Sequence, residues 1–274
     1  MGSAMRIHLL LVLTLLALPL PAAAQLKLTV ADRQGSKSFT IAQLLSDPAT
    51  KQVTIDKDVS YKRAMTYRAI PVQALLKDLK IAPDDYIQAR ASDGFSVGIP
   101  ARLLEADPAS GVEAFVAIEK PGEKWPNLPG KKDSAGPFFL VWQANKPGLI
   151  SSEYWPFKLA ELSVTDSPFK RWPGLAVDAS VPATDPVRRG LDRFVAVCIA
   201  CHRFKGEGEQ GPDLGQPMNP VEYFQLPALR KLLRDTTSVR VWPDHKMPTF
   251  DPEMLSDADI DGVIAWLGYK AGRK

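Results

Sequence analysis

The apolar positions in the first part of the chain follow a short period. From residue 26 to about residue 165 they either alternate with polar positions or run on for five residues, which is typical of half-buried and buried strands. Residues 38–45 are predicted to be the end of a strand that leads into a short helix, and residues 71–79 and 100–106 to be helices. Strands are predicted at residues 26–30, 53–55, 86–90, 95–99, 114–118, 138–142 and 160–164.

Turn signals support this division. Ser92, Asp93 and Gly94 separate two of the strands and predict a hairpin. Pro71 is predicted in the first turn of its helix, where the missing N–H costs little. Residues 121–136 are rich in Gly, Pro and Lys and predict a loop. Strands and short helices in this irregular order predict an α+β domain rather than a series of βαβ units.

The last part of the chain has a helical period. Asp185 is a predicted N-cap with Pro186 at the first helical position, and this helix runs toward residue 198. A closing helix is predicted at residues 256–270, with Ser256 as N-cap and acidic residues in its first turn. Its apolar positions lie on one face and are Ile260, Val263, Ile264, Trp266 and Leu267.

The sequence Cys198-Ile199-Ala200-Cys201-His202 holds the only two cysteines of the 274 residues. The spacing C-x-x-C-H is the attachment signal for c-type haem: each thiol forms a thioether, and the histidine becomes the proximal iron ligand. A thioredoxin-like redox pair has no need of the histidine. A zinc site needs further Cys or His ligands, and after residue 25 the chain offers only His245 besides His202. We therefore predict one covalent haem c.

Together with the haem signal, the last part of the chain resembles class I cytochrome c. In that family a Gly and an aromatic residue on the first helix cross the last helix, a pattern that Gly190 and Phe194 fit. The resemblance implies that Phe194 packs near Trp266 or Tyr269. The turn at residues 211–214 (GPDL) matches the family's G-P-x-L turn. The resemblance implies that residues 246–248 (KMP) carry the distal iron ligand, Met247. The competing ligands are His245, Met218 and Met254.

The first part resembles the sulfite-oxidase-type molybdopterin-binding domain. The likeness rests on residues 67–72 (YRAIPV), 91–100 (ASDGFSVGIP) and 136–141 (GPFFLV). Enzymes of that family hold molybdenum with a cysteine thiolate, whereas no cysteine occurs between residues 25 and 197. We therefore expect the fold without the molybdenum cofactor, kept as a scaffold for docking or for another ligand.

Aromatic and basic residues in this first part permit two interpretations. Tyr61, Tyr67 and the neighbouring Lys62, Arg63 and Arg68 either line an anion pocket or lie on a solvated strand or loop. Trp125, Trp142 and Trp155 either face a pocket or an interface, or pack in the core.

The start of the sequence predicts export. Arg6 precedes an apolar stretch at residues 9–20, and Ala22, Ala23 and Ala24 follow it, so a signal peptide cleaved after about Ala24 is expected. An uncleaved anchor is the alternative. Without Arg6 the 34 basic side chains become 33 against 31 acidic, a net charge of +2 that shows no nucleic-acid footprint. No later stretch is long and apolar enough to span a membrane.

The predicted organisation is a signal peptide (1–24), an α+β molybdopterin-binding-like domain (25–170), a proline-rich linker (171–185) and an all-α monohaem cytochrome c domain (186–274). The first hypothesis is a periplasmic carrier of single electrons between a dehydrogenase and an oxidase or another cytochrome, with the first domain used for docking or ligand binding. The alternative is a haem-bearing oxidoreductase, or a subunit of one, whose first domain binds substrate or a second cofactor. A haem-based ligand sensor is a third class.

Overall fold

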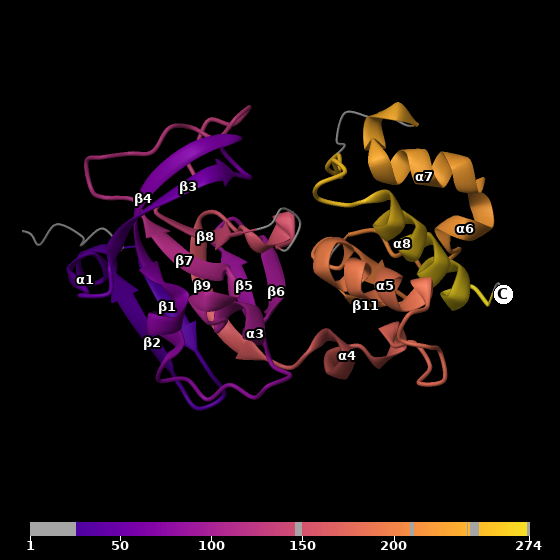
Figure 1. Cartoon of the computed structure of the whole chain (residues 1–274), viewed down its shortest axis with the longest axis horizontal. Helices are drawn as coiled ribbons and strands as arrows, with labels where there is room; N and C mark the ends of the chain where they lie inside the picture. The colour runs from indigo at the N-terminus through magenta and orange to yellow at the C-terminus, as the bar shows by residue number, and fades with distance from the viewer. Residues whose placement is uncertain (1–25, 146–149, 209–210, 240, 242–246, 273–274) are drawn as a thin grey trace, which may run out of the picture.

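The computed structural model describes residues 26–145, 150–208, 211–239, 241 and 247–272. The predicted signal peptide, His245 and Lys246 lie outside the described residues. The chain forms two parts, each with its own hydrophobic core, and passes from one to the other through the segment that contains α4 (Pro168–Arg171) (Figure 1). The N-terminal part is rich in strands and the C-terminal part is helical, so the predicted α+β then all-α organisation is confirmed.

A five-stranded sheet forms one layer of the N-terminal part, in the order β2-β1-β9-β5-β6. β1 and β9 are parallel, and the other neighbours in this sheet are antiparallel. The hairpin predicted at residues 92–94 joins β5 to β6, with Tyr86 opposite Pro100. The strands are β1 (Lys27–Ala31), β2 (Ser36–Thr40), β5 (Tyr86–Ala91), β6 (Ser96–Pro100) and β9 (Leu159–Thr165).

A four-stranded antiparallel sheet, in the order β3-β4-β7-β8, completes the N-terminal core. Its inner strand at residues 112–118 carries near-continuous apolar residues because both of its faces are covered: five consecutive residues from Ala114 to Ile118 are each at most 4% exposed. Short helices pack beside the sheets. The elements are β3 (Lys51–Asp58), β4 (Arg63–Pro71), β7 (Val112–Ile118), β8 (Phe138–Ala144), α1 (Ile41–Ser46), α2 (Val72–Leu76) and α3 (Ala101–Leu104).

Two local predictions in this part need correction. The helix predicted at residues 71–79 is α2, which ends at Leu76 and has Pro71 as its N-cap, because Pro71 still belongs to strand β4. Lys62 and Arg63 line a cavity, whereas Tyr61 and Tyr67 lie in the core. They are 4% and 1% exposed, and the Tyr67 hydroxyl donates to Asp58 at 2.8 Å. Trp142 and Trp155 belong to the same core.

The C-terminal part is built on the crossing of its first and last helices. These are α5 (Pro186–Arg193) and α8 (Asp257–Lys270), and the predicted caps are present: Asp185 accepts from the Val187 N–H, and Ser256 forms a capping box with Asp259. Further elements are η4 (Phe194–Cys198), the short strands β10 (Arg203–Phe204) and β11 (Glu207–Gly208), and the helices α6 (Pro220–Tyr223) and α7 (Leu226–Arg234).

The stretch predicted to be a linker packs against the C-terminal core. Leu175 is 0% exposed and its carbonyl accepts from the Trp266 indole N–H at 3.3 Å. Lys270 donates to the carbonyls of Gly174 and Ala176. The proline content of residues 171–185 predicted a linker but could not show which residues this segment packs against. Among the described residues, no helix has the length and apolar character needed to cross a bilayer.

Candidate haem-binding site

The attachment segment follows a widened helical turn. After α5 the chain continues as η4, a π-helix in which the Ile199 N–H donates to the Phe194 carbonyl at 2.9 Å. The turn then tightens, since the N–H groups of Cys201 and His202 both donate to the Cys198 carbonyl at 3.1 and 2.8 Å. Cys198 is half-buried, Cys201 is exposed and His202 is half-buried. One compact turn therefore carries both thiols and the imidazole.

The loop after this turn orients His202. Its Nδ1 lies 3.0 Å from the Pro212 carbonyl oxygen, so this nitrogen carries the proton and Nε2 is the nitrogen left to bind a metal. Burial lowers the pKa of His202, against the opposing effect of the Pro212 hydrogen bond, and keeps the imidazole in the neutral form that ligates metals. The backbone of the 211–214 turn thus supports His202 in this orientation.

Asp213, the variable position of the G-P-x-L turn, fixes that loop. Its carboxylate accepts from the N–H groups of Lys205, Gly206 and Gly215 at 2.9, 2.6 and 2.7 Å. Burial opposes ionisation, but these hydrogen bonds prevail and lower the pKa of Asp213. Gly211 packs so tightly on the turn that an added Cβ would lie 1.8 Å from the Cys201 carbonyl oxygen. No sequence motif assigned Asp213 this role in the loop. Its position between Gly211 and Gly215 was the available signal of a turn that a carboxylate could stabilise.

The attachment segment continues from α5, and the crossing of α5 with α8 holds it in place. A Cβ on Gly190 would lie 1.9 Å from the Gly262 carbonyl oxygen, so the two backbones are in direct contact. Phe194 and Trp266 stack with ring centroids 4.3 Å apart, as the resemblance to cytochrome c implies. Asp259 anchors the crossing through Arg189 at 2.8 Å and Arg193 at 3.3 Å. The last turn before Cys198 is thereby held rigidly.

Met247 lies against the same core as Cys198. Its carbonyl accepts from the hydroxyl of Thr236, a residue 0% exposed, at 3.1 Å. This bond ties the Met247 backbone to η5 (Thr236–Ser238). Of the competing ligands, Met218 is 49% exposed, and Met254 lines a cavity between the two parts of the molecule. Met247 as the distal ligand remains a prediction.

The thiol environment bears on the competing interpretations of C-x-x-C. Burial raises the pKa of the Cys198 thiol to about 12, and the nearby charges of Glu153 and Cys201 add to this effect. Redox-active and zinc-binding cysteines need the opposite shift, toward the thiolate. Within the part of the chain that the structure describes, no three His, Cys, Asp or Glu side chains are grouped to hold a metal ion. The donor set, a thiol pair with a neutral imidazole, fits haem c.

The N-terminal part contacts the attachment segment directly. Ser151, which is 8% exposed, donates its hydroxyl proton to the Ala196 carbonyl at 2.8 Å. Ala196 lies in the π-helical turn and packs against both cores. The next residues form the 3₁₀ helix η2 (Ser152–Tyr154), which packs on η4. No motif in the sequence pointed to Ser151 or Glu153 as neighbours of the cysteines.

Comparison with known proteins agrees with this geometry. The family model of cytochrome c matches residues 187–269. No curated protein matches the chain. Among solved structures, the crystal structure of the sulfane dehydrogenase SoxCD from Paracoccus pantotrophus matches with 18% identity and a TM-score of 0.36, covering 52% of this chain and 38% of that chain. This chain thus spans well under half the length of that structure's chain.

The C-terminal part of the chain is therefore a cytochrome c domain, and its expected cofactor is haem c. The helix crossing, the C-x-x-C-H turn and the loop that orients His202 are all in place for it.

Proposed function

We propose that the protein is an exported, periplasmic electron carrier with one covalent haem c. Cys198 and Cys201 form the thioethers, His202 binds the iron through Nε2, and Met247 is the second axial ligand. The observation that carries the proposal is the oriented, neutral His202 directly after the cysteine pair, inside a cytochrome c domain. Haem with thioether and imidazole ligands exchanges single electrons at a raised potential.

The chain's own residues hold the proposed haem site rigidly. The Phe194–Trp266 stack and the Asp213 hydrogen bonds hold the proximal side, and Thr236 holds the backbone at Met247. A rigidly held site would suit electron transfer to a docked protein. The partners we propose are a dehydrogenase on one side and an oxidase or another cytochrome on the other.

Optical spectroscopy of the full-length, haem-loaded chain tests this function. The oxidised protein is expected to show the weak far-red sulfur-to-iron charge-transfer band, and the reduced protein should not bind carbon monoxide. Met247→Leu should abolish the band and open the site to carbon monoxide, whereas Met254→Leu, the matched control, should change neither. A band that survives Met247→Leu overturns the ligand assignment, and wild-type binding of carbon monoxide favours a sensor.

A second candidate function follows from a cavity of about 930 Å³ lined by both parts of the molecule. Its walls include Trp155 and Met254. The Trp155 side chain is 8% exposed, and its buried indole N–H has no hydrogen-bond partner among the described residues. A substrate or second cofactor that accepts this hydrogen bond would make the chain part of an oxidoreductase. Iron as the only redox metal in the purified protein, with no organic cofactor released on denaturation, would argue against this candidate.

A further inference from the structure

One carboxyl group of the N-terminal part lies beside the haem-attachment turn and has no role in the site described above. Glu153 is on η2, which packs against η4, and the adjacent Ser151 bonds to the carbonyl of Ala196. Its charge is near enough to Cys198 to influence that thiol. The carboxyl group is therefore held near Cys198, one of the two residues that would attach the haem.

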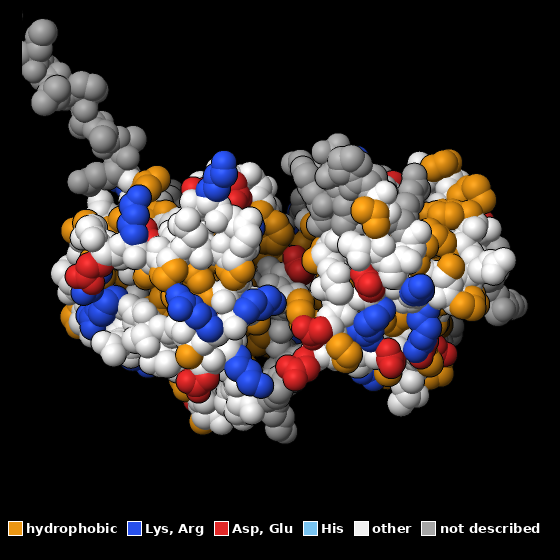
Figure 2. Space-filling view, turned by 90° about the horizontal axis from the view of Figure 1, so that it is seen from above, with side chains coloured by type: hydrophobic (Ala, Val, Ile, Leu, Met, Phe, Trp, Pro, Cys, Tyr) orange, Lys and Arg blue, Asp and Glu red, His pale blue; other side chains and the backbone are white. Residues whose placement is uncertain are grey.

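Glu153 also has a connection to solvent. The Ser152 hydroxyl donates to Glu153 Oε1 at 3.3 Å, and Ser152 lines the cavity of about 930 Å³ between the two parts. The surface is hollowed between these parts (Figure 2). A hydroxyl that both donates and accepts can pass a proton between cavity water and the carboxylate. Ser152 thus links the cavity to the Glu153 carboxylate.

We propose that Glu153 takes up one proton when the haem attached at Cys198 and Cys201 is reduced, which makes the reduction potential depend on pH. The inference rests on the proposed function. The electron comes from a reduced partner protein and the proton from solvent; the carboxylate gains an O–H bond as a hydronium ion of the solvent loses one and becomes water. Loss of one positive charge at the iron removes an attraction that favours the carboxylate, so protonation follows reduction.

Burial raises the pKa of Glu153 above its ordinary value, against the opposing Ser152 hydrogen bond, and so favours the protonated carboxyl group. Elements in contact with η2 include β6 and β8, which have no ionisable side chain, and η4, whose ionisable side chain is Cys198. Asp192 is the competing carboxyl group, since its pKa is also raised by burial. Nearby charged and titratable groups are Tyr86, Arg102, Tyr154 and Arg193.

The test is the midpoint potential of the full-length, haem-loaded protein as a function of pH. The wild-type potential should fall as pH rises, by up to about 59 mV per pH unit, the constant for one proton per electron. Glu153→Gln should remove this slope and hold the potential at the low-pH wild-type value. Ser152→Ala should move the sloping range to higher pH, because it deletes a hydrogen bond that lowers the pKa of Glu153.

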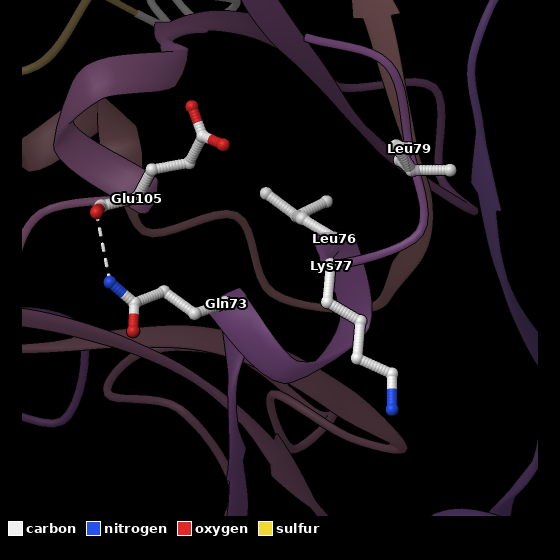
Figure 3. A pocket seen from close by; sticks show the side chains of 5 residues that line it. All are labelled: Gln73, Leu76, Lys77, Leu79 and Glu105. Carbon is white, nitrogen blue, oxygen red and sulfur yellow. Dashed lines mark hydrogen bonds between the residues drawn. The ribbon is translucent and has the colours of Figure 1, made fainter.

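Glu105→Gln is the matched control. It makes the same chemical change at a carboxyl group of raised pKa that lines a separate cavity of about 220 Å³ with Gln73, Leu76, Lys77 and Leu79 (Figure 3). The wild-type curve should persist in Glu105→Gln and in Asp192→Asn. A slope unchanged in Glu153→Gln, or abolished in Asp192→Asn, overturns the proposal.

Two further outcomes separate this proposal from the proposed function. A flat wild-type curve in a protein with the expected optical spectrum overturns only the role of Glu153, whereas a chain without covalent haem overturns the proposed function. If Glu153→Gln does not fold, the direction of the Ser152→Ala shift decides.

Discussion

The contact between α5 and α8 allows a graded test of the fold that holds the haem site. Gly190→Ala introduces a Cβ that would lie 1.9 Å from the Gly262 carbonyl oxygen and 2.8 Å from the Trp266 Cβ. The obstacle is backbone, which cannot move aside without separating the helices. Gly262→Ala meets backbone atoms at 3.0 Å or more, and Gly268→Ala meets nothing within 4 Å. The three substitutions are chemically identical and differ only in the space around them.

The expected magnitudes follow from two opposing effects. Replacing Gly by Ala in a helix interior stabilises by about 0.5–1 kcal/mol, and this gain alone applies at Gly268. Overpacking costs about 1–3 kcal/mol, occasionally more, and disturbing an aromatic pair such as Phe194–Trp266 adds about 0.5–1.5 kcal/mol. Gly190→Ala should therefore be less stable than Gly268→Ala by about 2–4 kcal/mol, with Gly262→Ala between them.

Urea unfolding of the full-length, haem-loaded protein measures this difference. Each part has its own core, so two unfolding transitions are possible. Absorbance of the attached haem follows unfolding of the C-terminal part, and far-UV circular dichroism follows unfolding of both parts. Equal stability of Gly190→Ala and Gly268→Ala would refute the claim that backbone contact sets the helix crossing. A change confined to the N-terminal transition would refute it as well.

The remaining predictions concern single side chains around the site. Asp213→Ala removes three backbone hydrogen bonds from the loop that orients His202 and should cost about 2–4 kcal/mol of unfolding free energy, and a value near zero would contradict its structural role. Asp259→Asn should cost about 1–3 kcal/mol at pH 7. Although burial opposes ionisation, bonds from Ser256 and Arg189 and the charge of Arg193 lower the pKa of Asp259. Its stabilisation is therefore present above the ordinary value of 3.8 and lost as pH falls through the lower folded pKa, so unfolding at pH 7 and pH 3 should show the difference shrinking. Ser151→Ala should cost about 1 kcal/mol of unfolding free energy and loosen the contact between the two parts. The amide of Ile199, which donates to the Phe194 carbonyl of η4, should then exchange faster with solvent, and unchanged exchange would contradict the prediction.

Local sequence signals were sufficient where the physics is local. The caps at Asp185 and Ser256, the hairpin at residues 92–94 and the buried strands at residues 114–118 and 138–142 all lie where the patterns predicted them. Each depends on backbone groups or side chains within a few residues of one another. Helices α6 and α7 were not predicted. A four-residue helix such as α6 carries no periodicity, whereas Pro227 in the first turn of α7 was an available start signal.

Other features depended on contacts between distant segments. Basic residues surround Tyr61 and Tyr67 in the sequence and suggested a surface position. In the core, however, the Tyr61 hydroxyl donates to the Pro126 carbonyl and the Tyr67 hydroxyl donates to Asp58. The predicted linker segment looked extended, yet Leu175 fills the C-terminal core. A pattern along the chain cannot show which distant group will satisfy a hydroxyl or cover a side chain.

The sequence by itself determined the haem chemistry of this protein: two thiols and an imidazole in five residues, with Gly190 and Phe194 one helical turn apart ahead of them. Attachment chemistry needs only that spacing, which is local. Tertiary structure alone brought Ser151 and Glu153 of the N-terminal part to the turn that carries Cys198, some 45 residues further along the chain. Burial and charge around the site belong to such non-local neighbours, because desolvation depends on everything packed around a group and not on its place in the sequence.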